Sequence, residues 1–170
     1  MMEKVFFIAD PHFGGESIIR YENRPFASAE EMDKVLVERW NAVVSKQDTV
    51  YVLGDFSMFM DDNKDYELLQ VLNGRKILIM GNHDRHRTSG QWRQLGFEEC
   101  SLWPIVYRDF YILSHEPVYI NKNMPYVNVY GHVHSNPSYR DASPQSVCVS
   151  AERTEYQPVT FEDIKKMLRG

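Results

Sequence analysis

Four consecutive residues, Gly81-Asn82-His83-Asp84, place an amide, an imidazole and a carboxylate next to a glycine. They follow directly on the apolar run at residues 77–80, which predicts that they lie at the end of a buried strand. Such side chains can bind a metal ion or transfer a proton, and the packing of a strand requires none of them. We therefore predict a reactive centre at this point of the chain.

Polar side chains of the same kinds follow four other predicted strands, at residues 5–9, 49–53, 110–113 and 126–130. They are Asp10 and His12, Asp55, His115, and His132 with His134. Any one of these could be a polar turn that ends a strand. Turns alone would have to produce the same residue bias independently at all five strand ends, so we expect these side chains to form one site.

The elements that must position these side chains alternate between strands and helices. Helices are predicted at residues 28–44, 61–72, 91–95 and 160–168, and a further strand at residues 146–150. Residues 101–106 are predicted to be an extended connector, and residues 16–26 a helical turn followed by a loop. This alternation indicates a layered α/β architecture, in which sites form at the carboxyl ends of strands. No repeat or linker interrupts the pattern, so residues 1–170 are expected to form a single domain.

The composition is that of an ordinary globular domain, with 43% hydrophobic and 25% charged residues. A net charge of −5 argues against stable binding to nucleic acid or to a membrane surface. The longest apolar run, residues 5–9, is too short for a membrane span or a signal-peptide core. Two cysteines, Cys100 and Cys148, form no disulfide framework, so a cytoplasmic location is expected. The sequence does not predict an oligomeric state.

The donor types indicate which metals the site would bind. Imidazole, carboxylate and amide groups without a thiolate suit Mn, Fe, Zn, Co or Ni, and not a structural zinc–cysteine site. The candidate ligands are Asp10, His12, Asp55, Asn82, His115, His132 and His134. They are too many for one four-coordinate ion and fit two ions about 3.5–4 Å apart, an arrangement that suits the hydrolysis of phosphate esters.

Taken in order, these motifs closely resemble the calcineurin-like metallophosphoesterase superfamily over residues 10–134. Residues 18–26 are similar to a small bacterial and phage subgroup of that superfamily. The resemblance implies a four-layer αββα sandwich, in which two mixed β-sheets are flanked by helices. Two positions depart from the pattern: Pro11 separates the first two ligands, and Gly15 replaces a more usual polar residue.

The resemblance also implies a role for each candidate residue. The first metal ion would be bound by Asp10, His12 and His134. The second would be bound by Asn82, His115 and His132, and Asp55 would bridge the two ions. His83 would assist the leaving group instead of binding metal. Asp84 would orient the His83 imidazole, because a neighbouring carboxylate selects the tautomer of a histidine.

These roles describe a metal-dependent phosphoric ester hydrolase in which a metal-bound hydroxide attacks a phosphodiester or a phosphomonoester. The diester is favoured because His83 can help an alcohol to leave, and Mn²⁺ is favoured among the possible metals. The expected substrate is a phosphorylated small molecule or a nucleotide. Two alternatives remain: a non-catalytic metal-binding scaffold of the same fold, and a protein serine/threonine phosphatase, for whose substrate groove 170 residues leave little material.

Weaker candidates for substrate contacts lie in loops near the predicted site. Arg20, Arg24, Arg85 and Arg87 could each bind a phosphate through two parallel hydrogen bonds, although each is explained equally well as a solvated surface arginine. The aromatic residues Tyr21, Phe26, Phe56 and Phe59 could stack on a nucleobase, although packing in the core is their commoner use.

Overall fold

The computed structural model describes residues 3–136 and 144–169 and contains two mixed β-sheets packed face to face. The first sheet has the order β4-β3-β2-β1-β9, with strands β1 (Val5–Ile8), β2 (Thr49–Val52), β3 (Arg75–Ile79), β4 (Glu99–Ser101) and β9 (Val159–Thr160). Strands β1 to β4 are parallel, and β9 runs antiparallel to β1. The second sheet has the order β5-β6-β7-β8, with strands β5 (Ile105–Tyr107), β6 (Tyr111–Leu113), β7 (Val127–Tyr130) and β8 (Ser146–Cys148). Only β5 is antiparallel to its neighbour there.

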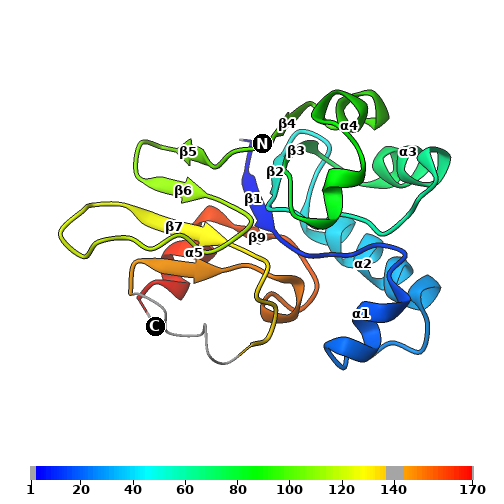
Figure 1. Cartoon of the computed structure of the whole chain (residues 1–170), viewed down its shortest axis with the longest axis horizontal. Coiled ribbons are helices and arrows are strands. Elements are labelled where there is room, and N and C mark those ends of the chain that lie inside the picture. The colour runs from blue at the N-terminus through cyan, green and yellow to red at the C-terminus, as the bar shows by residue number, and fades with distance from the viewer. Residues whose placement is uncertain (1–2, 137–143, 170) are drawn as a thin grey trace.

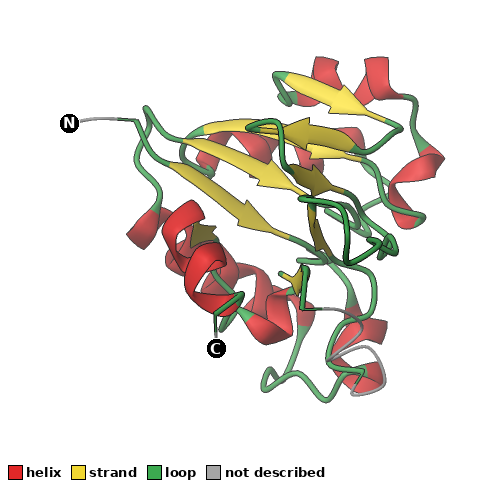
Figure 2. Ribbon diagram, turned by 90° about the vertical axis from the view of Figure 1, so that its left-hand side faces the viewer, coloured by secondary structure: helices red, strands yellow, loops and turns green. Residues whose placement is uncertain are grey.

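Helices flank the sheets, and together they form the αββα sandwich that the sequence predicted. They are α1 (Glu16–Tyr21), α2 (Ala29–Val43), α3 (Asp62–Val71), α4 (Ser89–Leu95) and α5 (Phe161–Met167). Figure 1 shows α1 to α4 on the side of the first sheet that faces away from the second sheet. Figure 2 shows α5 alongside the strands near the C-terminal end, where it contacts β1 and β9. Within the described residues, no helix is both long enough and apolar enough to cross a membrane.

The central strands β1 and β2 are almost entirely apolar because both of their faces are buried. On β1, Phe6 and Ile8 pack with the helices, whereas Phe7 and the following Ala9 pack against the second sheet. The strand β2 divides its side chains in the same way. This explains why the predicted strands show continuous apolar runs in place of alternation.

The parallel register brings the polar strand ends together. Val5 pairs with Thr49, and Thr49 pairs with Arg75, so β1, β2 and β3 end at the same edge of the first sheet. At this edge Ala9 forms a bridge to Ser150, which joins the two sheets. The carboxyl ends of strands from both sheets therefore meet in one place.

Most of the predicted elements are confirmed, and the differences concern short strands. The strands β4, β5 and β9, which have two or three residues, were not predicted, because so few residues show no periodicity. As a result, the predicted connector at residues 101–106 contains the end of β4 and the start of β5. The spacing of apolar residues within the predicted helix at residues 61–72 places Tyr66 on its inward face, but in α3 this side chain is 50% exposed.

Candidate metal centre

The backbone is in the left-handed region at most of the candidate ligands, where residues other than glycine are rarely found. The φ angles are 54° at Asp10, 51° at His12, 53° at Asp55, 68° at His132 and 51° at His134. Such conformations cost about 1–3 kcal/mol each and persist only where the surrounding structure imposes them. Local strain is thus concentrated at the residues that were selected for their chemistry.

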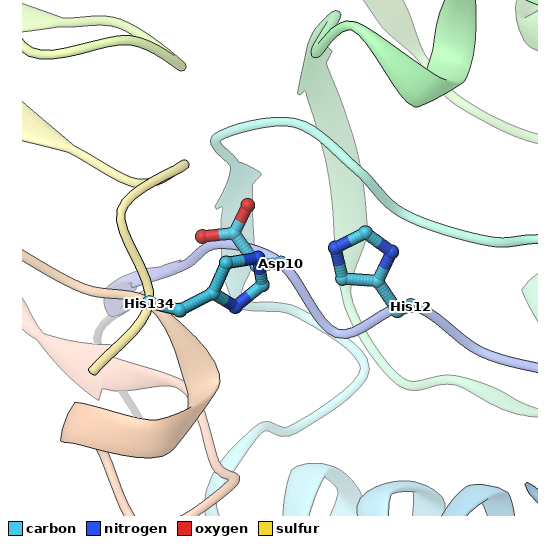
Figure 3. A group of neighbouring side chains, drawn as sticks. All are labelled: Asp10, His12 and His134. Atoms are coloured by element: carbon cyan, nitrogen blue, oxygen red, sulfur yellow. The ribbon is translucent and has the colours of Figure 1, made fainter. Parts of the chain in front are cut away.

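Asp10, His12 and His134 form the first donor group, in which one ligand atom from each lies within 4.8 Å of the others. Figure 3 shows the three side chains gathered where the chain leaves β1 and where the loop that carries His134 passes. The atoms Oδ1 of Asp10 and Nε2 of His12 are buried and have no hydrogen-bond partner in the described part of the chain. A buried polar atom normally has a partner, so this group has the properties expected of ligands for a divalent cation.

Asp55, His115 and His132 form the second donor group, also within 4.8 Å. The Oδ1 atom of Asn82 completes it, at 3.0 Å from Nε2 of His115 and 3.1 Å from Nδ1 of His132. Donors bound to one ion at about 2.0–2.1 Å lie roughly 3–3.5 Å from each other. The observed separations therefore fit a second cation.

Asp55 lies between the two groups. Its Oδ2 atom is 3.6 Å from Nε2 of His12 and 3.5 Å from Nε2 of His115. Its Oδ1 atom accepts a hydrogen bond of 2.9 Å from the backbone N–H of His83. The carboxylate is thus positioned to be shared by two ions, and it also orients the chain at His83.

Hydrogen bonds at the Nδ1 atoms of two histidines leave their Nε2 atoms as the candidate metal ligands. Nδ1 of His115 lies 2.9 Å from the carbonyl oxygen of Leu53, which makes Nδ1 the protonated nitrogen and leaves Nε2 for a metal. Nδ1 of His134 lies 3.1 Å from the carboxylate of Glu152, with the same consequence. Burial lowers the pKa of His12 well below its usual value, so this imidazole is also an unprotonated donor.

Arg24 is an internal support of the first donor group and does not point toward a substrate. Its side chain is buried, and its guanidinium donates to the carbonyl oxygens of Asp10 (2.7 Å) and Pro11 (2.8 Å) and to Glu152 (2.8 Å). Through Glu152 the same guanidinium is connected to His134. The expectation that Arg24 binds phosphate is therefore corrected, because its donors are already used inside the protein.

Asp84 also differs from the expectation. Its buried carboxylate accepts hydrogen bonds from the backbone N–H groups of Asp55 (2.7 Å), Gly81 (2.7 Å) and Phe56 (2.9 Å). Among the described contacts, none joins it to the His83 imidazole. Asp84 thus ties the loop after β2 to the loop after β3, and does not orient His83.

The other arginine candidates do not enter the site. Arg87 is buried, with its guanidinium 4.7 Å from the ring centre of Trp92 and paired with Asp62 (2.8 Å) and Asp65 (2.9 Å). Its predicted contact with substrate is corrected for the same reason as that of Arg24. Arg85 and Arg20 are exposed, and neither lines the cavity that opens from the donor groups.

That cavity has a volume of about 780 Å³ and is lined by side chains from both donor groups. His83 is exposed and also lines it, with its ring 5.4 Å from that of His12 and roughly perpendicular to it. An imidazole at this position can reach a ligand that is bound in front of the donor groups. The geometry is thus compatible with the expectation that His83 acts on the substrate and does not bind metal.

Close approach of the loops explains the glycine in the opening motif. A Cβ atom on Gly81 would lie 2.2 Å from Oδ1 of Asp55 and 2.6 Å from its backbone nitrogen. The φ angle of Gly81 is not in the left-handed region, in contrast to that of Gly54. The position therefore requires glycine because of the lack of space, and not because of a left-handed backbone conformation.

Two residues that contact the candidate ligands were missed at the sequence level. Glu152 contacts His134, and the hydroxyl of Ser150 donates to Oδ2 of Asp10 at 2.6 Å. Ser150 is the last residue of the predicted strand at residues 146–150, and Glu152 follows two residues later. The pattern of polar residues at strand ends, applied to this strand as well, would have identified them.

Comparison with known proteins shows similarity along the whole chain. A family model described as calcineurin-like phosphoesterase matches residues 3–169. An uncharacterized protein of Methanocaldococcus jannaschii is 36% identical over 173 residues, covering 98% of the chain and 92% of that protein. The Gene 66 protein of Mycobacterium phage L5 is 36% identical over 85 residues, covering 49% of the chain and 41% of that protein. The crystal structure of a protein of unknown function from Aquifex aeolicus has a TM-score of 0.75 and 26% identity, covering 98% of this chain and all of that one.

Proposed function

The chain belongs to the calcineurin-like phosphoesterase family, and from this premise we propose that it hydrolyses phosphodiesters at a centre of two divalent metal ions. The observation that carries the proposal is the position of Asp55. Its carboxylate lies within 3.6 Å of a histidine from each donor group, at the head of an open cavity. A carboxylate shared between two sets of donors is what a pair of metal ions requires.

The donor groups determine which residues would bind each ion. Asp10, His12 and His134 would bind one, and Asn82, His115 and His132 the other. When bound, two such ions neutralise the charge of the phosphate and acidify a water molecule. The chain itself holds the donors in place through Ser150, Glu152 and the carbonyl oxygen of Leu53. We favour Mn²⁺, and Fe, Zn, Co or Ni would suit the same donors.

His83 is proposed to give a proton to the leaving alcohol. Its imidazole faces the cavity, and its backbone N–H is bound to Asp55, which keeps it beside the donor groups. Asp84 contributes by holding the loop in place, and not by contacting the imidazole. Assistance to a leaving alcohol matters most for a diester, which is why we favour diesters over monoesters.

Two other functions compete with this proposal. A non-catalytic metal-binding scaffold of the same fold would use the metal donors but would have no use for His83, an imidazole that lines the cavity and belongs to neither donor group. A protein phosphatase would need an extended groove, whereas the cavity of about 780 Å³ has the size of a small-molecule site. The substrate we propose is therefore a phosphorylated small molecule or a nucleotide.

The test measures hydrolysis of a diester, bis-p-nitrophenyl phosphate, and of a monoester, p-nitrophenyl phosphate, by protein loaded with each candidate metal. With Mn²⁺ bound, the diester is expected to be cleaved faster than the monoester. The variant Asp55→Ala should lose bound metal. The variant His83→Ala should keep both ions, as measured by inductively coupled plasma mass spectrometry, while kcat falls by about 10²–10⁴-fold. Absence of hydrolysis with every metal would refute the proposed phosphoesterase activity. Equal metal loss in both variants would refute the proposed role of His83.

A further inference from the structure

The cavity extends beyond the donor groups to a wall formed by α1, the turn that follows it, and the loops that carry Met58 and Asn136. The residues of this wall include Ile18, Tyr21, Glu22, Asn23, Met58 and Asn136. None of them binds a candidate ligand residue through a described hydrogen bond, and the proposed hydrolysis uses none of them. A substrate whose phosphate lies at the donor groups would place its remaining part against this wall.

Tyr21 gives the wall an aromatic surface. Its side chain is 79% exposed, although a large ring is normally at least partly covered. The other aromatic residues considered for stacking are used elsewhere: Phe56 packs on Phe13 and Phe97, and Phe26 packs on Tyr156. Phe59 packs against the hydrophobic core and does not line the cavity. Tyr21 is therefore the one of these aromatic residues that is available to a ligand in the cavity.

Glu22 gives the wall an oriented acceptor. Its Oε2 atom accepts hydrogen bonds from the hydroxyl (2.5 Å) and the backbone N–H (3.3 Å) of Ser135, which follows His134. The carboxylate is thus tied to the loop of the metal centre, and no described residue donates to its other oxygen. None of the described residues that line the cavity is a lysine or an arginine, so the wall suits an uncharged group with N–H or O–H donors.

We propose that this wall binds a planar, uncharged ring of the substrate, such as a nucleobase, which stacks on Tyr21 and donates a hydrogen bond to Glu22. The proposal rests on the proposed function, because it concerns the same cavity and supplies the substrate class. The apolar side chains of Ile18 and Met58 lie in the same lining and can cover the ring edge. Stacking tolerates different bases, so the class and not a single base is predicted.

The test compares two competitors that differ only in the base, adenosine 5′-monophosphate and ribose 5-phosphate. Their inhibition constants are measured from initial rates of bis-p-nitrophenyl phosphate hydrolysis by the full-length, Mn²⁺-loaded protein, with inorganic phosphate as a third competitor. The nucleotide is expected to bind about tenfold more tightly than ribose 5-phosphate, which corresponds to the lower part of the range for stacking on an aromatic side chain.

Variants test whether residues of the wall cause the preference for the nucleotide over ribose 5-phosphate. Tyr21→Ala should reduce the preference to near unity, and Tyr21→Phe should keep it, because the ring remains. Glu22→Gln should reduce it about fivefold, since the acceptor loses its charge. Tyr119→Ala is the matched control, because Tyr119 is 83% exposed and does not line the cavity.

The outcomes separate the two proposals. Equal inhibition by the nucleotide and ribose 5-phosphate, or a preference that survives Tyr21→Ala, would overturn the ring site while the phosphoesterase stands. If the protein hydrolyses no phosphate ester with any of the metals, the proposed function is overturned and the ring site with it. A preference that is lost in Tyr21→Ala and kept in Tyr21→Phe supports the ring site.

Discussion

Replacing Glu152 with glutamine is expected to weaken the first metal site and to spare the second. The carboxylate of Glu152 lies 3.1 Å from Nδ1 of His134 and 2.6 Å from the guanidinium of Arg24. Arg24 in turn binds the carbonyl oxygens of Asp10 and Pro11. One residue therefore supports two of the candidate ligands of the first ion, His134 directly and Asp10 through Arg24, and none of those proposed only for the second.

The magnitude follows from these contacts. Loss of a carboxylate that orients a metal-binding histidine typically lowers metal affinity by 10–100-fold, or about 1.4–2.7 kcal/mol. Glutamine also removes the charge that balances a fully buried guanidinium, and such a loss destabilises a protein by about 3–5 kcal/mol. Both the affinity of the first site and the free energy of unfolding should fall.

The assay measures the bound Mn²⁺ by inductively coupled plasma mass spectrometry after gel filtration at limiting free metal. Wild-type protein should retain two ions per chain and Glu152→Gln one. Electron paramagnetic resonance provides a second measurement, because the exchange-coupled signal of a Mn²⁺ pair should be replaced by that of an isolated ion. Urea unfolding of the metal-free protein reports the change in stability separately.

Asp65→Asn is the matched control for this experiment. Asp65 is buried and paired with Arg87 at 2.9 Å, so its variant also removes a buried charge partner of a buried guanidinium, but away from the metal donors; Arg87 keeps its more exposed partner Asp62. It should lower stability and leave both ions bound. If Asp65→Asn loses metal to the same extent, or if Glu152→Gln weakens both ions equally, Glu152 does not act by positioning the first site.

Two further predictions concern the space around the ligands and their protonation. Gly81→Ala should displace Asp55 and reduce metal binding, as measured by titration against a chelator. Gly90→Ala in α4 is the control, because a Cβ atom there would lie 3.9 Å from its nearest neighbour, Oγ1 of Thr88; this variant should bind metal normally and gain about 0.5–1 kcal/mol of stability in urea unfolding. Normal metal binding by Gly81→Ala would contradict the packing argument. Burial raises the pKa of Asp10 from 3.8 to about 6, so between these values the metal-free folded protein retains a proton that the unfolded chain has released. The contribution of Asp10 to the free energy of unfolding should therefore fall by up to about 3 kcal/mol as the pH rises through this window, and the total fall should be smaller by this amount in Asp10→Asn. Urea unfolding in chelator at about pH 4.5 and 7.5 tests this, and an identical pH dependence in both proteins would exclude Asp10 as its source.

Much of the architecture could be predicted from local patterns. The capped helix at Ala29–Val43 and the strands β1, β2 and β3 are visible because each is long enough to show its apolar run or its capping residues. The strands β4, β5 and β9 have two or three residues and are defined by their pairing partners. Pairing is a contact between distant segments, which local propensity does not contain.

The sequence by itself determined which side chains could bind metal, because their types are unusual and they recur at strand ends. Only the tertiary structure decided what their neighbours do. Arg24 and Arg87 could not be distinguished from surface arginines until their partners, as distant as Glu152 for Arg24, were brought against them. Asp84, next to His83 in the chain, bonds to the backbone of Asp55 and Phe56 instead. The physical reason is that buried charges are satisfied by whichever groups the fold places within hydrogen-bonding distance, and sequence proximity does not determine that distance.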